Sequence, residues 1–239
     1  MEEVARAIGA DSRIGSKFLK AGPGFGGSCF QKDILNLVYL CGHYGLEEVA
    51  AYWQSVVRLN AWQQHRIARE VVQRLFGTVS GKRIAVLGFA FKANTNDTRE
   101  SPAIRICRDL LEEGAFLAIY DPKVNPAQIA ADLGQAESTP TSGHEYVNAS
   151  FGERLWLSCS TADDACAGAD AVVVLTEWQE FARLNWAALA RLMRQPAWVF
   201  DTRGAVEASA VRAAGLCLWR LGSNSTPAAP ALCCAGDVR

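Results

Sequence analysis

Buried strand patterns alternate with helical patterns over residues 82–221, and this alternation limits the folds open to the chain. The stretches "KRIAVLGFAF" and "AFLAIYDP" predict two buried strands, separated by a helix "PAIRICRDLLEEG" that begins with Pro102. Further strands are predicted over 154–159, 171–176, 197–201 and 216–221, with helices over 162–168, 178–193 and 206–214. Alternation of this kind predicts an α/β domain, a doubly wound Rossmann-like parallel sheet with helices on both faces.

Helical patterns precede this region. A short helix is expected over residues 2–8, and apolar residues at helical spacing predict a second one from Cys29 to Gly42. Residues 46–76 contain neither Gly nor Pro, which is long for one globular helix. We therefore expect that helix to span two domains or to form a subunit interface.

These patterns divide the chain into three parts. Residues 1–77 are expected to form a central helical dimerisation region, and residues 78–222 the Rossmann-like domain. Residues 223–239 show no periodicity and predict a disordered tail. Within the domain, the polar stretch 135–153 predicts a surface loop.

Composition excludes several classes of protein. The formal net charge of −1 leaves no basic surface for nucleic acid and no polybasic anchor for a lipid surface. No apolar run approaches the roughly 20 residues that cross a bilayer, and the acidic start of the chain does not resemble a secretory signal. None of the eight cysteines forms a C-x-x-C pair, so a zinc site has no support. We expect a cytoplasmic protein without nucleic-acid, membrane or metal partners.

The first predicted strand of the α/β region lacks the usual cofactor fingerprint. In "VLGFAF", Gly88 stands alone where a dinucleotide-binding domain has G-x-G-x-x-G. The sequence therefore gives no sign that this domain binds NAD by itself.

A glycine-rich turn, "GPGFGGSCFQKD", precedes the second helix. Gly22, Gly24, Gly26 and Gly27 allow positive φ and close approach of a ligand, and their successive N–H groups predict an anion cradle, most simply for a phosphate. Cys29 follows at the start of the helix, where the positive end of the helix dipole favours thiolate over thiol.

Two charged residues follow this cysteine within one turn. Lys32 adds positive charge near the sulfur, and Asp33 is placed to orient a water or a hydrogen bond beside it. The pattern favours covalent catalysis on a phosphate-bearing substrate. A structural thiol in a glycine turn is the alternative, and spacing alone leaves both open.

This motif resembles the catalytic cysteine motif of the UDP-glucose 6-dehydrogenases, within the UDP-glucose/GDP-mannose dehydrogenase family. The stretches "ADSRIGSKFLKAGPGFGGSCFQKD", "VLGFAFKANTNDTRES", "YDPKV", "VVVLTEW" and "VFDTR" follow the family's order and spacing. The resemblance implies an NAD-dependent oxidation of UDP-glucose to UDP-glucuronate through a cysteine thiohemiacetal and thioester, in a dimer or higher homo-oligomer.

The resemblance also implies roles for individual residues. Cys29 matches the nucleophile and Asp33 the aspartate that assists water and proton transfer. Arg13 matches an arginine that reaches the substrate of the neighbouring subunit. The implied substrate-binding residues are Arg13, Lys20, Ala21, Gly22, Pro23, Gly24, Phe25, Gly26, Phe30, Phe91, Lys92 and Arg203. The implied NAD contacts are Cys29, Phe30, Gln31, Lys32 and Arg99.

The chain departs from the family in two places. Thr202 and Gly204 flank Arg203 where the family has a glycine and usually a second arginine. The family's N-terminal NAD-binding domain has no counterpart here, so we expect a C-terminal fragment of the enzyme, or a short product without turnover. The alternatives are a catalytically inactive UDP-sugar-binding or dimerisation module, and a related dehydrogenase of GDP-mannose or a UDP-amino sugar.

Overall fold

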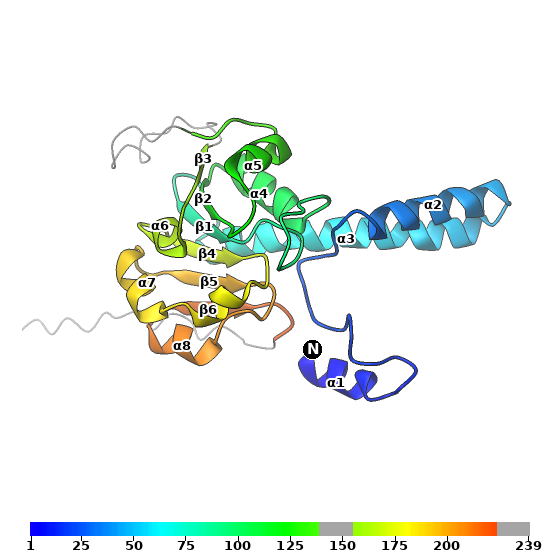
Figure 1. The fold of residues 1–239 in the computed structure, drawn as a ribbon, viewed down its shortest axis with the longest axis horizontal. Coiled ribbons are helices and arrows are strands. Elements are labelled where there is room, and N and C mark those ends of the chain that lie inside the picture. Colours follow the sequence, from blue (N-terminus) through cyan, green and yellow to red (C-terminus); the bar gives the residue numbers. More distant parts are fainter. Residues whose placement is uncertain (139–154, 224–239) are drawn as a thin grey trace, which may run out of the picture.

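The computed structural model describes residues 1–138 and 155–223. A six-stranded sheet lies at its centre, with the strand order β3-β2-β1-β4-β5-β6 (Figure 1). All neighbouring strands are parallel. The strands are β1 (Arg83–Leu87), β2 (Phe116–Tyr120), β3 (Leu155–Ser158), β4 (Ala171–Val174), β5 (Trp198–Asp201) and β6 (Cys217–Arg220). This order confirms the predicted doubly wound Rossmann-like domain.

The two central strands are apolar along their length because both faces of the sheet are covered. Residues 84–87 of β1 and 171–174 of β4 are fully buried, as expected for parallel strands between two helical layers. The strand order reverses between β1 and β4. In sheets of this kind, ligands bind at the carboxyl ends of the strands beside that reversal.

Helices connect the strands on both faces. Helices α4 and α5 connect the strands β1, β2 and β3, and helices α7 and α8 connect β4, β5 and β6. Right-handed crossovers place the two groups of helices on opposite faces of the sheet. The bounds are α4 (Pro102–Glu112), α5 (Pro126–Leu133), α6 (Ala162–Cys166), the short 3₁₀ helix η2 (Gln179–Arg183), α7 (Trp186–Leu192) and α8 (Ala208–Ala213).

Three helices precede the sheet, as predicted: α1 (Glu2–Gly9), α2 (Phe30–His43) and the 28-residue α3 (Glu47–Arg74). Helices α2 and α3 pack side by side and project from the sheet domain (Figure 1). The last turns of α3 enter the core of that domain, where Ile67 and Val71 are fully buried. At its end, the Arg74 guanidinium lies 5.8 Å from the Trp198 ring of β5. Helix α3 therefore runs without a break from the helical hairpin that it forms with α2 into the core of the sheet domain.

Two helices differ from the sequence prediction. The single helix expected over 178–193 is wrong, because Asn185 interrupts it: its side chain accepts the Ala188 N–H at 3.1 Å and caps a new helix, α7. Helix α5 was not predicted, although its ends carry clear signals. Asn125 caps it with Pro126 in the first turn, and Gly134 ends it with φ of 74°.

Two predicted irregular segments fall mainly on residues 139–154 and 224–239, which lie outside the described residues. At the edge of the first segment, Ser138 pairs with Trp156 of β3: the Ser138 N–H donates to the Trp156 carbonyl at 2.8 Å. Among the helices of the described ranges, none has the length and apolar character needed to cross a membrane.

Candidate active site

The glycine loop, residues 22–27, lies between helix α3 and the sheet domain. The buried Asn60 of α3 holds it from one side: its Oδ1 accepts the Phe25 N–H at 2.8 Å, and its Nδ2 donates to the Phe25 carbonyl at 3.1 Å. Gln63, about one turn after Asn60 along α3, donates to the Gly22 carbonyl at 3.2 Å. One face of α3 therefore fixes the path of the loop, a role that neither residue was assigned from the sequence.

The loop needs glycine mainly because it packs closely on the sheet domain. A Cβ at Gly26 would lie 2.3 Å from the Glu100 carbonyl oxygen, and one at Gly27 would lie 2.9 Å from the Phe91 ring. Gly24 has φ of 130°, and a Cβ there would meet the Asn60 Oδ1 at 2.7 Å. From the sequence, these glycines were expected to allow close approach of a ligand. In the structure they allow close packing of neighbouring protein atoms.

The expected cradle of successive N–H groups is correspondingly smaller. The Phe25 N–H donates to Asn60, and the Gly27 N–H donates to the Arg99 carbonyl at 2.8 Å. Pro23, which is buried, has no N–H to offer. Anion binding by consecutive backbone N–H groups of this loop is therefore not supported, and positive side chains are better candidates for phosphate contacts.

Cys29 is exposed and directly precedes the first residue of α2. Its Sγ lies 3.7 Å from the Ser28 Oγ. Lys32 and Asp33 are both exposed, and the Asp33 N–H donates to the Cys29 carbonyl at 2.9 Å in the first helical turn. The structure thus places the thiol and the carboxyl one turn apart at the open end of the helix.

Aromatic rings surround this helix end. The Phe30 ring, 54% exposed, lies 5.8 Å from the Phe25 ring and 6.5 Å from the Phe18 ring between centroids. Phe18, 91% exposed with φ of 62°, was not singled out from the sequence. An aromatic residue just before a glycine loop was the available signal, but only the fold shows that it faces Phe30.

Arg99 lies close to Cys29, on the segment between β1 and α4. Its guanidinium is 69% exposed and pairs with Asp97 at 2.7 Å. The hydrogen bonds that Arg99 donates to Asp97 and the negative charge of Asp97 raise the pKa of Arg99, and the nearby Cys29 adds to this shift. In the same segment, the Lys92 Nζ lies 5.2 Å from the centre of the Phe91 ring. The positive charges predicted at 92 and 99 are therefore accessible.

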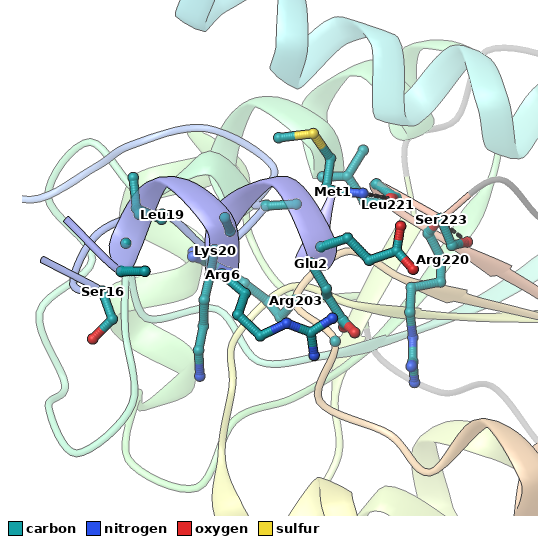
Figure 2. Close-up of a pocket in the computed structure, with 17 residues that line it drawn as sticks. Met1, Glu2, Arg6, Ser16, Leu19, Lys20, Arg203, Arg220, Leu221 and Ser223 are labelled. Atoms are coloured by element: carbon teal, nitrogen blue, oxygen red, sulfur yellow. Dashed lines mark hydrogen bonds between the residues drawn. The ribbon is translucent and has the colours of Figure 1, made fainter. Parts of the chain in front are cut away.

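A cavity of about 870 Å³ lies between α1 and the carboxyl ends of β5 and β6 (Figure 2). Lys20, Ala21 and Arg203, three predicted substrate-binding residues, line it. The basic side chains of Arg6 and Arg220 and the acidic side chains of Glu2 and Glu3 line it as well, so basic charges are in the majority. Cys29 does not line this cavity. The described structure thus has two centres, a basic cavity and an exposed thiol, joined by the glycine loop.

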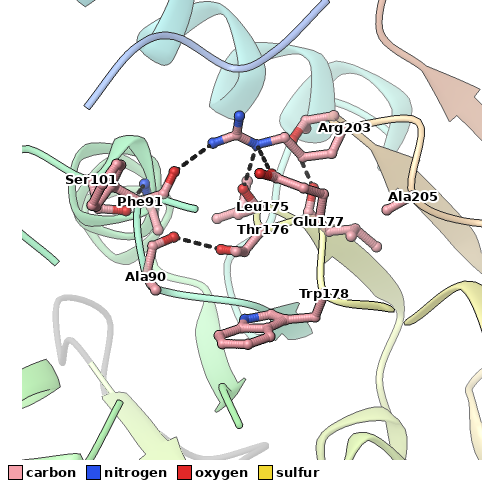
Figure 3. A network of polar contacts seen from close by, with 12 residues as sticks. Ala90, Phe91, Ser101, Leu175, Thr176, Glu177, Trp178, Arg203 and Ala205 are labelled. Carbon is pink, nitrogen blue, oxygen red and sulfur yellow. Dashed lines mark hydrogen bonds and ion pairs between the residues drawn. The ribbon is translucent and has the colours of Figure 1, made fainter. Parts of the chain in front are cut away.

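Arg203 connects the segments that follow three neighbouring strands, β1, β4 and β5 (Figure 3). Its Nε donates to the Leu175 carbonyl after β4 at 2.9 Å, and its Nη2 donates to the Phe91 carbonyl after β1 at 3.1 Å. Glu177 pairs with its Nε at 3.3 Å. Burial lowers the pKa of Arg203, and Glu177 opposes that effect. A Cβ at Gly22 would lie 3.4 Å from the remaining nitrogen, Nη1, so only one edge of this guanidinium faces the glycine loop.

Asp121 explains why the turn after β1 lacks a dinucleotide fingerprint. Its Oδ2 accepts the N–H groups of Phe89 and Ala90 at 2.7 and 3.0 Å, and the Trp178 Nε1–H at 3.2 Å. In dinucleotide-binding domains the backbone N–H groups of this turn face the cofactor's pyrophosphate. Here a carboxylate of the chain fills that position, so this turn does not fit NAD.

Arg13 stands apart from both centres. It follows α1, is 86% exposed, and pairs with Asp11 at 2.6 Å. Its implied reach to a neighbouring subunit stays a prediction.

Comparison with known proteins shows which family the chain resembles. The model of the "UDP-glucose/GDP-mannose dehydrogenase family, UDP binding domain" matches residues 85–208, and the family's central-domain model matches residues 1–62. The UDP-glucose 6-dehydrogenase of Drosophila melanogaster is 52% identical over 203 residues, which cover 85% of this chain and 41% of that protein. The Caenorhabditis elegans protein of the same name is 47% identical over 224 residues, covering 94% and 44%.

A solved structure is similar as well. The UDP-glucose dehydrogenase of the archaeon Pyrobaculum islandicum matches with a TM-score of 0.65 and 29% identity, over 87% of this chain and 43% of that one. The chain spans less than half the length of the curated relatives it matches. Because the UDP-binding model alone matches more than half of the residues, and the central-domain model includes the glycine loop and Cys29, the chain belongs to the UDP-glucose/GDP-mannose dehydrogenase family.

Proposed function

We propose that the protein containing this chain is an NAD-dependent UDP-glucose 6-dehydrogenase, which oxidises UDP-glucose to UDP-glucuronate with Cys29 as the nucleophile. The observation that carries the proposal is the position of Cys29. It is exposed at the start of α2, and the adjoining glycine loop is packed against the residues that follow β1. The high identity to enzymes of that name supports the choice of substrate within the family.

The basic cavity is the proposed place of the substrate's diphosphate. Lys20 lines it from the segment before the glycine loop, and Arg203 from the end of β5. Arg6 adds positive charge, and Arg220 also lines the cavity while paired with Asp201 at 3.0 Å. Arginine and lysine are the side chains that bind phosphate oxygens most strongly. A substrate anchored there would extend along the segment from Lys20 to Cys29, which contains the glycine loop.

The need for a thiolate follows from the second half of the reaction. Loss of a hydride and a proton from the C6 alcohol gives an aldehyde, which has no hydride to donate readily until a nucleophile adds to it. Addition of the Cys29 sulfur forms a thiohemiacetal, and loss of a second hydride leaves a thioester. Water then attacks the thioester carbon, which releases the carboxylate and regenerates the thiolate. Asp33, one turn from Cys29, is the proposed group that orients this water and takes its proton.

Two molecules of NAD, bound in turn, would each accept one of the two hydrides. Within the described residues, the exposed Arg99 beside Cys29 fits a contact to an anionic cofactor. Phe30, Gln31 and Lys32 lie at the same helix end and are the further proposed contacts. The turn after β1 does not fit the cofactor's pyrophosphate, because Asp121 already accepts its N–H groups. We therefore place only one end of the cofactor on this chain.

We also propose that the helical hairpin pairs with a second copy of the chain. Exposed large apolar side chains lie along both helices, including Tyr39 at 68%, Tyr52 at 63%, Leu59 at 64% and Trp62 at 49%. So much exposed apolar surface on one projecting element is typical of an interface. Only in such an oligomer could Arg13 make its implied contact with the substrate of the neighbouring subunit.

The related-dehydrogenase alternative is tested by competition binding. UDP-glucose, UDP and GDP-mannose would be titrated against one another on the purified chain. Tighter binding of GDP-mannose than of UDP-glucose would contradict the proposed substrate. Binding of UDP-glucose without any NAD reduction by the native protein would favour the binding-module alternative.

Substitution of the nucleophile in the native protein tests the reaction itself. Cys29→Ser should lower steady-state NADH production from UDP-glucose by about a thousandfold or more, because removal of a covalent nucleophile has an effect of this order. Cys217→Ser, at a half-buried thiol of β6, is the matched control and should leave turnover unchanged. Full turnover by the Cys29→Ser protein would overturn the proposed mechanism.

A further inference from the structure

Two consecutive residues of the sheet domain contact the chain on both sides of Cys29. The Arg99 carbonyl accepts the Gly27 N–H at 2.8 Å, two residues before the cysteine. The Glu100 Oε2 accepts a hydrogen bond from the Gln31 Nε2 at 2.9 Å, two residues after it. The Glu100 carbonyl also fills the space that a side chain at Gly26 would occupy. Cys29 thus sits in a short segment whose two ends are fixed to the same pair of residues.

Glu100 is itself held in an unusual conformation. Its φ is 53°, a left-handed value that few residues other than glycine and asparagine adopt. The buried Ser101 anchors it from behind: its hydroxyl donates to the Phe89 carbonyl at 2.7 Å and caps α4 by accepting the Ala103 N–H at 3.3 Å. On the other side, Asp97 accepts the Arg99 N–H at 3.0 Å. A strained residue that is fixed from both sides is a feature that function, rather than chain geometry, tends to retain.

We propose that Glu100 is a positioning residue for Cys29. Its carboxylate holds Gln31, in the first turn of α2, so that the positive end of the helix stays in place beside the sulfur. This inference rests on the proposed role of Cys29. It extends that role, because the position of the Cys29 thiol would depend on the segment that carries Arg99 and Glu100. The thiol and Arg99 would then keep a fixed position relative to each other.

A chance surface contact is the alternative, since Cys29 and Glu100 are both exposed. Two observations argue against it. The side-chain bond between Gln31 and Glu100 joins residues 69 apart in sequence, and it is accompanied by a backbone bond and by the close approach at Gly26. A chance contact between two exposed side chains would not be expected to come with a backbone hydrogen bond and a close backbone approach at the same place.

The test measures alkylation of Cys29 by iodoacetamide in the full chain at fixed pH, followed by the mass of the Cys29 peptide. Gln31→Ala removes the bond without changing charge and should slow alkylation about two- to fivefold, the range of effects seen at helix ends. Gln128→Ala is the matched control, because Gln128 donates to Asp132 on α5 at 3.0 Å, far along the chain from the site. It should leave the rate unchanged.

Two further variants separate positioning from a general effect on the fold. The double variant Gln31→Glu with Glu100→Gln reverses the direction of the hydrogen bond and keeps the net charge, so it should restore the wild-type rate. Glu100→Gly removes the carboxylate but relieves the left-handed backbone. It should slow Cys29 as Gln31→Ala does, without lowering the thermal unfolding midpoint.

A wild-type alkylation rate in Gln31→Ala, or no recovery in the reversed pair, would overturn the inference. The proposed function is tested by a different measurement, the turnover of the native protein. If Cys29→Ser leaves turnover of the native protein intact, Cys29 is not the nucleophile, whatever the alkylation rates show.

Discussion

Two of the glycine turns near the carboxyl edge of the sheet, at residues 22–27 and at Gly88, have different surroundings. The loop at residues 22–27 lies on the surface of the sheet domain and is held by polar contacts from Asn60 and Arg99. The turn at Gly88 lies inside the domain, between the buried Thr176 and the carboxylate of Asp121. In both turns glycine admits protein atoms.

This difference teaches that glycines alone do not identify a phosphate site. In the first turn, positive side chains from Lys20 and Arg203 supply the charge that the backbone does not. In the second, an internal carboxylate has taken the place of a ligand phosphate. The first turn is therefore expected to matter for the reacting groups, and the second for the stability of the domain.

Gly88→Ala should have the largest effect on stability. A Cβ there would lie 2.4 Å from the Cβ of the buried Thr176, and the residue has φ of 93°. Overpacking together with a left-handed backbone should lower the free energy of unfolding by about 3–5 kcal/mol. Denaturant unfolding measures this loss.

Gly168→Ala is the control for that substitution, because its φ is 67° but its Cβ would meet nothing within 4 Å. It should lower the free energy of unfolding by about 1–2 kcal/mol, through the backbone term alone. Equal losses at the two positions would mean that the space around Gly88 is not tight, and the contrast between the turns would fail.

Asp121→Asn comes next in size. The carboxylate accepts five hydrogen bonds, from the N–H groups of Phe89, Ala90, Lys123 and Val124 and from the Trp178 indole. The asparagine NH2 group would replace one accepting oxygen and face at least one of these N–H groups, which leaves that N–H without an acceptor. We therefore expect a loss of about 2–4 kcal/mol in the free energy of unfolding. Thermal or denaturant unfolding would show it, and a loss below about 0.5 kcal/mol would contradict the view that this carboxylate organises the turn.

The sheet was predictable because each strand is a short apolar run and each crossover a helical pattern. The residues at its carboxyl edge were harder to assign. Cys29 stands out in sequence because a thiol follows four glycines, but Asn60 and Gln63 belong to an ordinary helical pattern, and only the path of α3 brings them to the loop. Glu177 and Glu100 likewise carry no local signal, since their partners lie 26 and 69 residues away. Long-range pairing of polar groups is what a local pattern cannot contain.

Gly26→Ala should give the smallest loss of global stability and the clearest local effect. A Cβ would lie 2.3 Å from the Glu100 carbonyl oxygen, so the loop must move away from the sheet domain. The contacts that it loses lie where the loop meets the sheet domain, such as the hydrogen bond from the Gly27 N–H to the Arg99 carbonyl. We expect a fall of about 1–2 kcal/mol in the free energy of unfolding and faster hydrogen exchange of the Gly27 amide.

Gly22→Ala serves as the control within the same loop, because its Cβ would make only an ordinary 3.4 Å contact with the Arg203 Nη1. It should leave both the unfolding curve and the exchange at Gly27 unchanged. If Gly26→Ala lowered stability as much as Gly88→Ala, the loop would be part of the folding core rather than a surface element docked on it. The thiol of Cys29 could then not be repositioned without unfolding the domain, and its coupling to Glu100 would be a consequence of folding alone.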